Sequence, residues 1–178
     1  IDSKERNWIA LESEKQEKVK EINVKLSKLS QDFKSNLNKS KKEFEYHISD
    51  FEIIKNIPQE TLDSAKKRAE DKLLEWYLFD SDPTSFMDIL TYCSDSSVRE
   101  YIANVRTSFA SSWKYDNRWI ILEILKLKEE KSQILWYKNF AELSLASKMA
   151  DSPEQIFELI WWISKKAKQK AYLEIETL

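Results

Sequence analysis

The residue types that could do chemistry in this chain are one histidine and one cysteine. His47 lies in "EYHISD", where a catalytic or metal-binding role would need partners at a suitable spacing, and none of the usual His-rich signatures is present. Cys93 is the single cysteine, so no disulfide or cysteine-rich metal site can form within the chain. We therefore interpret His47 as an ordinary semi-exposed side chain and Cys93 as a buried, inert thiol.

No other residue pattern indicates catalysis. The 178 residues include no glycine, so the glycine-rich loops that bind phosphate cannot form. The 31 acidic residues are spread over charged segments, and no pair has a spacing that marks an acid/base couple. A Ser–His arrangement would depend on His47 alone. The sequence therefore predicts no catalytic, metal-binding or cofactor-binding residue in this chain.

The charge pattern argues against two classes of partner. The 29 basic and 31 acidic side chains leave a formal net charge of -2, and they are interleaved, as in "ESEKQEKVKE". We therefore expect neither nucleic acid nor membrane as a partner. The longest apolar run, residues 157–163, is far shorter than the roughly 20 residues that cross a bilayer. No signal peptide is visible, and we expect a cytoplasmic location. Because the chain begins with Ile1 rather than Met, we expect a piece of a longer protein.

Apolar spacing predicts an all-α fold of about seven helices with almost no strand. A long amphipathic helix is expected over residues 10–45, where Val19, Ile22 and Leu26 begin a stripe at three- and four-residue steps. A short extended segment is expected within 44–58. We expect these elements to form a single all-helical region, residues 1–178. Shorter helices are expected from Pro58 to about Glu75, from Phe86 through Leu90, from Ser97 through Phe109, from about Arg118 to Leu135, over 140–149, and from Pro153 to the C-terminus.

Several side chains are predicted to cap these helices. "SVRE" has the spacing of a capping box that begins at Ser97. Asn117 and Asn139 each precede a helical pattern and are predicted N-caps. In "DSPEQ", Ser152 is the predicted cap and Pro153 occupies the first helical position.

Four stretches carry a family resemblance: "IPQETLDSAKKRAEDK", "SFMDILTYCSDSSVREYIANVRTSFAS", "KYDNRWIILEILKLKEEKSQIL" and "YKNFAELSLASKMADSPEQIFELI". In this order they resemble the N-terminal helical region of the thimet oligopeptidase and oligopeptidase A family of zinc metallopeptidases. The resemblance runs from about Leu11 to the end of the chain. Its most specific stretches are "DILTYCSDSSVRE", "KYDNR" and "YKNFAELSLASKMADSP".

This resemblance implies a segment of a larger, two-lobed helical enzyme whose deep channel admits short peptides. The family's zinc is held by H-E-x-x-H plus a more distant Glu, and that motif lies C-terminal to the matched region. One histidine cannot supply two ligands, so no family metal or catalytic residue is carried onto this sequence. We expect the chain to form one wall of the channel, to bind no zinc itself and to be inactive alone. Its expected partners are the catalytic lobe and, through the complete enzyme, short peptides.

Two other functions stay open at this stage. The chain could be a stand-alone helical interaction protein that retains the fold, or a coiled-coil protein built on the 10–45 helix. We favour the enzyme segment because the final helix is still amphipathic at its last residue. This hypothesis predicts exposed apolar surface around Ile156, Leu159, Ile160 and Ile163.

Seven tryptophans and no glycine make the composition unusual, since glycine is ordinarily about 7% of residues. The resembled family usually has glycine where this chain has Trp136, Trp113, Trp76 and, more loosely, Trp8. Glycine commonly ends helices because it adopts a positive φ angle without a Cβ clash. We hypothesise that UGA codons meaning glycine are read as tryptophan in this sequence. The alternative is that all seven are true tryptophans, packed in a core or forming an aromatic surface.

Overall fold

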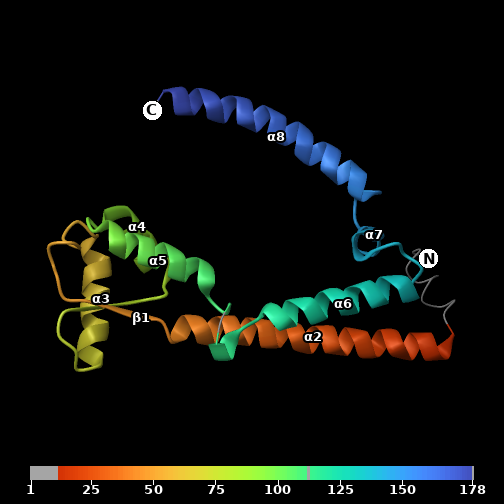
Figure 1. The fold of residues 1–178 in the computed structure, drawn as a ribbon, viewed down its shortest axis with the longest axis horizontal. Coiled ribbons are helices and arrows are strands. Elements are labelled where there is room, and N and C mark those ends of the chain that lie inside the picture. The colour runs from red at the N-terminus through yellow and green to blue at the C-terminus, as the bar shows by residue number, and fades with distance from the viewer. Residues whose placement is uncertain (1–11, 112, 178) are drawn as a thin grey trace. The chain divides into compact units, whose positions relative to one another are not determined.

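The computed structural model describes residues 12–111 and 113–177. Within them lie seven α-helices, one short 3-10 helix and one two-stranded sheet (Figure 1), which confirms the all-α class. Trp8 and the side chain of Trp113 lie outside what is described. The elements are α2 (Ser13–Lys42), β1 (Glu45–Ile48), α3 (Gln59–Asp71), β2 (Tyr77–Asp80), α4 (Pro83–Tyr92), α5 (Ser96–Ser108), the 3-10 helix η1 (Trp113–Tyr115), α6 (Arg118–Ile134), α7 (Phe140–Leu145) and α8 (Pro153–Glu176).

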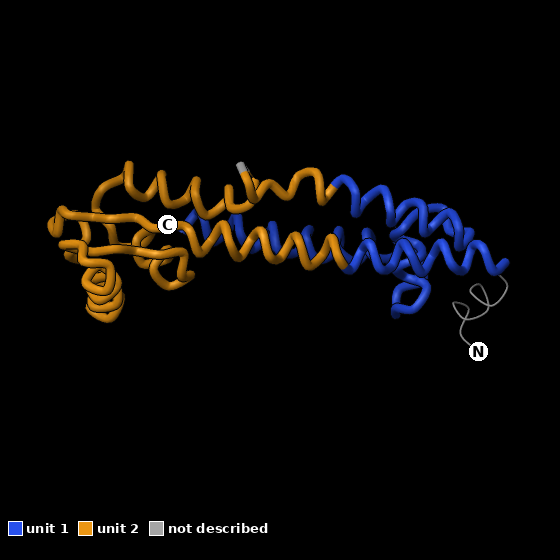
Figure 2. Tube along the Cα trace, turned by 90° about the horizontal axis from the view of Figure 1, so that it is seen from below, with its two compact units in different colours: residues 1–27, 122–178 blue, residues 28–121 orange. Residues whose placement is uncertain are grey.

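The chain divides into two compact units (Figure 2). Unit 1 comprises residues 1–27 and 122–178, and unit 2 comprises residues 28–121. The expectation of a single all-helical region over 1–178 stays a prediction.

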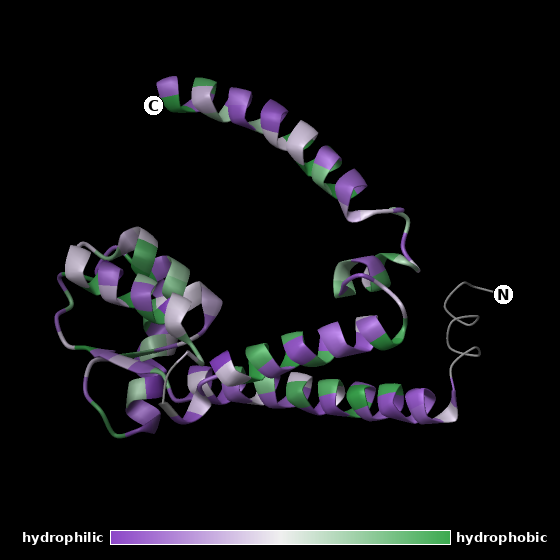
Figure 3. Cartoon of the chain, turned by 45° about the vertical axis from the view of Figure 1, so that its right-hand side comes forward, coloured by the Kyte–Doolittle hydropathy of each residue, from purple (hydrophilic) through white to green (hydrophobic). Residues whose placement is uncertain are grey.

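The long helix α2 has the apolar stripe that its sequence predicts. Val19 and Ile22 are buried, and Leu26 is partly buried one turn further on. Within unit 1 the start of α2 is joined to the end of α6 by the Lys18–Glu130 ion pair, whose Nζ and Oε1 atoms are 2.7 Å apart. The hydropathy colouring in Figure 3 shows the hydrophobic positions recurring along α2 between charged ones. The stripe therefore explains why this segment folds as one helix of 30 residues.

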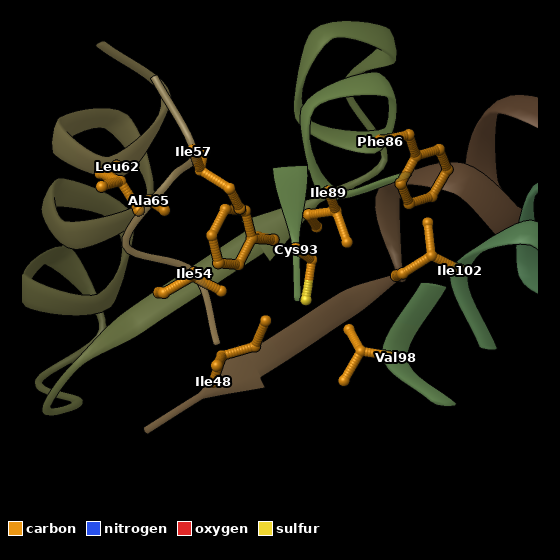
Figure 4. Packing of buried hydrophobic residues seen from close by; sticks show 11 residues of the cluster. Ile48, Ile54, Ile57, Leu62, Ala65, Phe86, Ile89, Cys93, Val98 and Ile102 are labelled. Carbon is orange, nitrogen blue, oxygen red and sulfur yellow. The ribbon is translucent and has the colours of Figure 1, made fainter. Parts of the chain in front are cut away.

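Unit 2 is organised around a small sheet and one hydrophobic core. Strands β1 and β2 pair antiparallel, with Glu45 opposite Asp80 and Ile48 opposite Tyr77. Phe79 on β2 is fully buried and packs with apolar side chains from α3, α4 and α5. Figure 4 shows ten labelled members of this core from close by. The buried members of this core are Ile48, Ile54, Ile57, Leu62, Ala65, Phe79, Phe86, Ile89, Cys93, Val98 and Ile102.

Strand β2 was not expected, and the helix before it is shorter than predicted. The predicted helix ran from Pro58 to about Glu75, whereas α3 ends at Asp71. The backbone turns because Leu73 adopts a φ of 58°, and the Leu74 N–H then donates to the Ala69 carbonyl at 2.9 Å. This left-handed turn frees Tyr77–Asp80 to pair with β1, which lies in the segment where a short extended stretch was predicted.

Two of the four helix caps predicted from the sequence are confirmed. The Asn139 side chain accepts a hydrogen bond from the Glu142 N–H, and Ser152 accepts one from the Gln155 N–H, as predicted. The predicted Ser97 capping box is wrong, because α5 begins one residue earlier and Asp95 is its N-cap. The Asp95 carboxylate accepts hydrogen bonds from the N–H groups of Ser97 and Val98, and its negative charge suits the positive end of the helix.

The C-terminal part of unit 1 has a smaller core. Leu135 after α6 and Leu143 on α7 are buried against each other, with Ile134, Tyr137 and Phe140 partly buried around them. Helix α7 spans six residues, which is shorter than the predicted 140–149. Helix α8 extends for 24 residues and none of them is buried.

The Asp95 cap predicts a dependence of stability on pH. Hydrogen bonds from the Ser97 hydroxyl and from the backbone N–H groups of Val98 and Ser97 lower the pKa of the Asp95 carboxyl below its ordinary value. A group whose pKa is lowered by folding stabilises the fold above its unfolded pKa, about 4 for Asp, and that contribution is lost as the pH falls further. Thermal unfolding followed by circular dichroism should therefore show a falling Tm below about pH 4.

Asp95→Asn is the matched variant for this measurement. Asparagine caps helices about as well as aspartate but does not titrate. The variant should therefore fold, and its Tm should fall less steeply than the parent's below about pH 4. A variant whose Tm falls with acid as steeply as the parent's would show that the Asp95 carboxylate does not contribute.

Candidate functional site

The single histidine is tied to the backbone. His47 lies on β1 and is exposed, and its Nε2 atom is 2.6 Å from the Glu75 carbonyl oxygen. A carbonyl oxygen only accepts, so Nε2 carries the proton and donates it. This nitrogen is therefore engaged in holding the segment before β2 against β1.

The single cysteine belongs to the core, as predicted. Cys93 is 3% exposed and packs among the apolar side chains of unit 2 (Figure 4). Burial raises the pKa of the Cys93 thiol above its ordinary value, which favours the neutral thiol over the nucleophilic thiolate.

The described residues hold no ready-made metal site. Across residues 12–111 and 113–177, no group of three or more His, Cys, Asp or Glu side chains is arranged to hold an ion. In the same stretches, no helix is long and apolar enough to pass through a bilayer.

The stretch "KYDNR", residues 114–118, forms a clasp on the end of α2. Lys114 Nζ donates to Glu43 Oε1 at 2.7 Å, and the Tyr115 hydroxyl donates to the same oxygen. The hydrogen bonds from Lys114 and Tyr115 lower the pKa of the Glu43 carboxyl. These contacts are on the surface of unit 2, where solvent and salt weaken ion pairs.

Asn117 is the buried centre of this KYDNR clasp. It is 3% exposed, its Nδ2 donates to the Phe33 carbonyl at 3.1 Å, and its Oδ1 accepts from Asn36 Nδ2 at 2.9 Å. The Asn117 backbone N–H donates to the Ala110 carbonyl at 2.8 Å. All three contacts lie within unit 2, and the two made by the side chain join the loop after α5 to residues more than 80 positions earlier in the chain.

The predicted role of Asn117 as the side-chain cap of α6 is therefore wrong. Asp116 accepts the hydrogen bond from the Arg118 N–H at 2.9 Å instead. The physical reason is that a buried amide must satisfy both its donor and its acceptor, and α2 offers a partner for each.

One candidate binding surface is the apolar face of α8. We use this name for Ile156, Phe157, Leu159, Ile160 and Ile163, whose spacing places them along one side of the helix. Of the four residues predicted to be exposed, Leu159, Ile160 and Ile163 are at least half exposed, whereas Ile156 is partly buried. Phe157, which was not predicted, is 70% exposed. Figure 3 shows hydrophobic positions beside hydrophilic ones along α8.

A hollow in unit 2 has a volume of about 620 Å³ and lies beside Trp76. The Phe51 and Tyr77 rings stack there with their centroids 6.1 Å apart. Its charged lining residues, among them Lys66 and Glu70, are exposed. The hollow is a shallow aromatic surface without a buried polar group to orient a substrate.

Taken together, the described residues form a helical segment with the KYDNR clasp in unit 2 and an exposed apolar face on α8. Comparison with known proteins gives its family. The model of Peptidase family M3 matches residues 89–178, and the chain belongs to this family.

Individual relatives extend the similarity over nearly the whole chain. Oligopeptidase A of Escherichia coli is 32% identical over 98% of this chain and 26% of its own length. The probable cytosolic oligopeptidase A of Arabidopsis thaliana is 34% identical over 96% of this chain and 25% of its own length. The thimet-like oligopeptidase of Dictyostelium discoideum is 28% identical over 88% of this chain and 22% of its own length. The chain thus spans about a quarter of the length of these relatives. Their similarity over nearly the whole chain confirms the resemblance inferred from the four sequence stretches.

The KYDNR clasp predicts that two asparagines contribute differently to the free energy of unfolding. Asn117→Ala removes a buried amide and should lower the free energy of unfolding by about 2 kcal/mol, because Asn36 loses its partner. Asn38→Ala changes an exposed residue on α2 and should shift it by less than about 0.5 kcal/mol. Urea unfolding followed by circular dichroism measures both, and equal effects would show that the clasp contributes nothing.

Proposed function

We propose that this chain is a helical segment of a zinc metallo-oligopeptidase that hydrolyses short peptides. In this proposal it forms one wall of the substrate channel, and the metal site lies in a part of the protein outside these 178 residues. The observation that carries the proposal is the similarity to oligopeptidase A over 98% of the chain. The cytosolic relative supports a cytoplasmic location.

The chain's own residues do not fit the zinc site of the resembled family. That site needs two histidines one helical turn apart, whereas this sequence has only His47, which lies on a strand and donates Nε2–H to a carbonyl. The zinc of the proposed enzyme would therefore be held elsewhere, and this segment would contribute shape to the channel and support to the fold.

The apolar face of α8 supports a role within a larger protein. Phe157, Leu159 and Ile160 are each more than half exposed, and α8 has no buried residue. A helix with such a stripe ordinarily packs that stripe against other protein. We propose that the catalytic lobe covers this face, since the matched relatives are about four times as long as the chain.

The same face favours one alternative. A stand-alone helical interaction protein would also need an exposed apolar surface, which a separate partner protein would cover. The two functions differ in whether the gene encodes H-E-x-x-H downstream of residue 178.

The first test compares the isolated chain with the complete gene product. The complete product should cleave short fluorogenic peptides, lose this activity to a chelator and regain it with zinc. The isolated chain should neither cleave them nor bind zinc stoichiometrically. His47→Ala in the complete product is the control and should leave the activity unchanged. Stoichiometric zinc binding by the isolated chain, or a complete gene without H-E-x-x-H, would contradict the proposal.

The second test examines the apolar face of α8. Ile160→Asp should reduce the binding of a hydrophobic dye to the isolated chain. In the complete product it should lower the free energy of unfolding by about 3 kcal/mol, because the face is buried there. Glu158→Gln, on the opposite side of α8, should change neither quantity. An isolated chain that binds no dye would point to a self-sufficient domain.

A further inference from the structure

The five tryptophans whose side chains the structure describes lie on the surface. Tryptophan side chains are on average highly buried, since their large apolar area stabilises a core. None of those whose side chains are described contributes to a core, so of the two settings given for true tryptophans only an aromatic surface remains for them. The exposed fractions are 52% for Trp76, 58% for Trp119, 62% for Trp136, 65% for Trp161 and 53% for Trp162.

Trp136 occupies a backbone position that ordinarily belongs to glycine. It follows the end of α6 with a φ of 61°. Its N–H donates to the Gln133 carbonyl at 3.1 Å, and the Tyr137 N–H donates to the Ser132 carbonyl at 2.9 Å. This pair of hydrogen bonds is the Schellman motif, in which the left-handed residue after the helix is usually glycine because a Cβ atom is strained there.

Trp76 occupies a similar position. It has a φ of 73° and immediately precedes β2, where the chain turns from α3 into the sheet. A bulky residue at positive φ is a genuine outlier, whereas glycine adopts this conformation freely.

The left-handed positions are enriched in tryptophan. In the described residues four non-glycine positions have positive φ, and the other two are Leu73 and Ala110. Two of the four are therefore tryptophan, although tryptophan is only 7 of the 178 residues. Leu73 and Ala110 show that the backbone tolerates a Cβ atom at this geometry, so the enrichment requires a separate cause.

The contacts of the Trp136 ring do not supply that cause. Its recorded ring contact is with Lys15, whose Nζ is 5.9 Å from the ring centroid, at the outer limit for a cation–π interaction. The ring is otherwise largely in solvent, so packing does not explain a tryptophan at this corner.

We propose that the natural protein has glycine at positions 76 and 136, because the organism reads the codon UGA as glycine. One event then accounts for two observations at these positions: the exposure of the Trp76 and Trp136 side chains and their left-handed backbone conformation. The proposal is independent of the proposed peptidase function.

The gene and the native protein test this directly. Codons 76 and 136 should both be UGA, and the protein purified from its own organism should yield a tryptic peptide of residues 132–138 with the mass expected for glycine at 136. The peptide of residues 73–99 reports on position 76 in the same digest. A UGG codon at either position, or tryptophan in either peptide, would overturn the proposal at that position.

A recombinant comparison tests the structural part. Trp136→Gly and Trp76→Gly in the full chain should each raise the Tm by about 3 °C, since a left-handed residue loses its Cβ clash. Trp162→Gly is the matched control, because Trp162 is equally exposed but lies within α8, where glycine should lower the Tm. If Trp136→Gly and Trp76→Gly also lowered the Tm, the proposal that these two backbone positions suit glycine would be overturned.

Discussion

The buried amide of Asn117 is the interaction on which unit 2 depends most. Its donor and acceptor both reach α2, at Phe33 and Asn36, while its own N–H reaches Ala110 at the end of the preceding turn. One residue thus fixes the direction in which the chain leaves α5 and enters α6. An unpaired buried amide is costly, so alternative positions of this loop against α2 are disfavoured more strongly than by apolar packing alone.

This role gives a physical meaning to one of the stretches that carry the family resemblance. "KYDNR" contains Lys, Tyr, Asp and Arg, which are residue types that often take part in catalysis, yet here each forms a hydrogen bond that shapes the loop. The single cysteine is likewise a packing residue, and the single histidine supports the sheet. Membership of a peptidase family is therefore compatible with polar side chains that, in the described residues, form structural contacts. In our proposal this segment supports the fold of the complete enzyme, and the peptide-cleaving chemistry belongs to another part of that protein.

The corners of the fold show a conflict between residue type and backbone conformation. In natural sequences the residue type usually suits the backbone conformation, so that a left-handed corner is occupied by glycine or asparagine. At positions 76 and 136 the φ angles suit glycine, whereas the side chains are large and solvent-exposed. The helix-ending geometry at 136 is complete in its hydrogen bonds, which indicates that the surrounding sequence specifies the turn and that the residue at its centre is the exception.

The sequence alone determined the features that depend on neighbours within one or two helical turns. Apolar spacing predicted α2 and the all-α class, and the caps at Asn139 and Ser152 were found because a cap bonds to a residue three positions away. The apolar face of α8 was largely predictable for the same reason. Only the tertiary structure decided the pairing of β2 with β1, the end of α3 and the partners of Asn117. The pairing of the strands and the partners of Asn117 depend on contacts between residues about 30 to 80 positions apart, and no local pattern specifies which distant group will be within hydrogen-bonding distance.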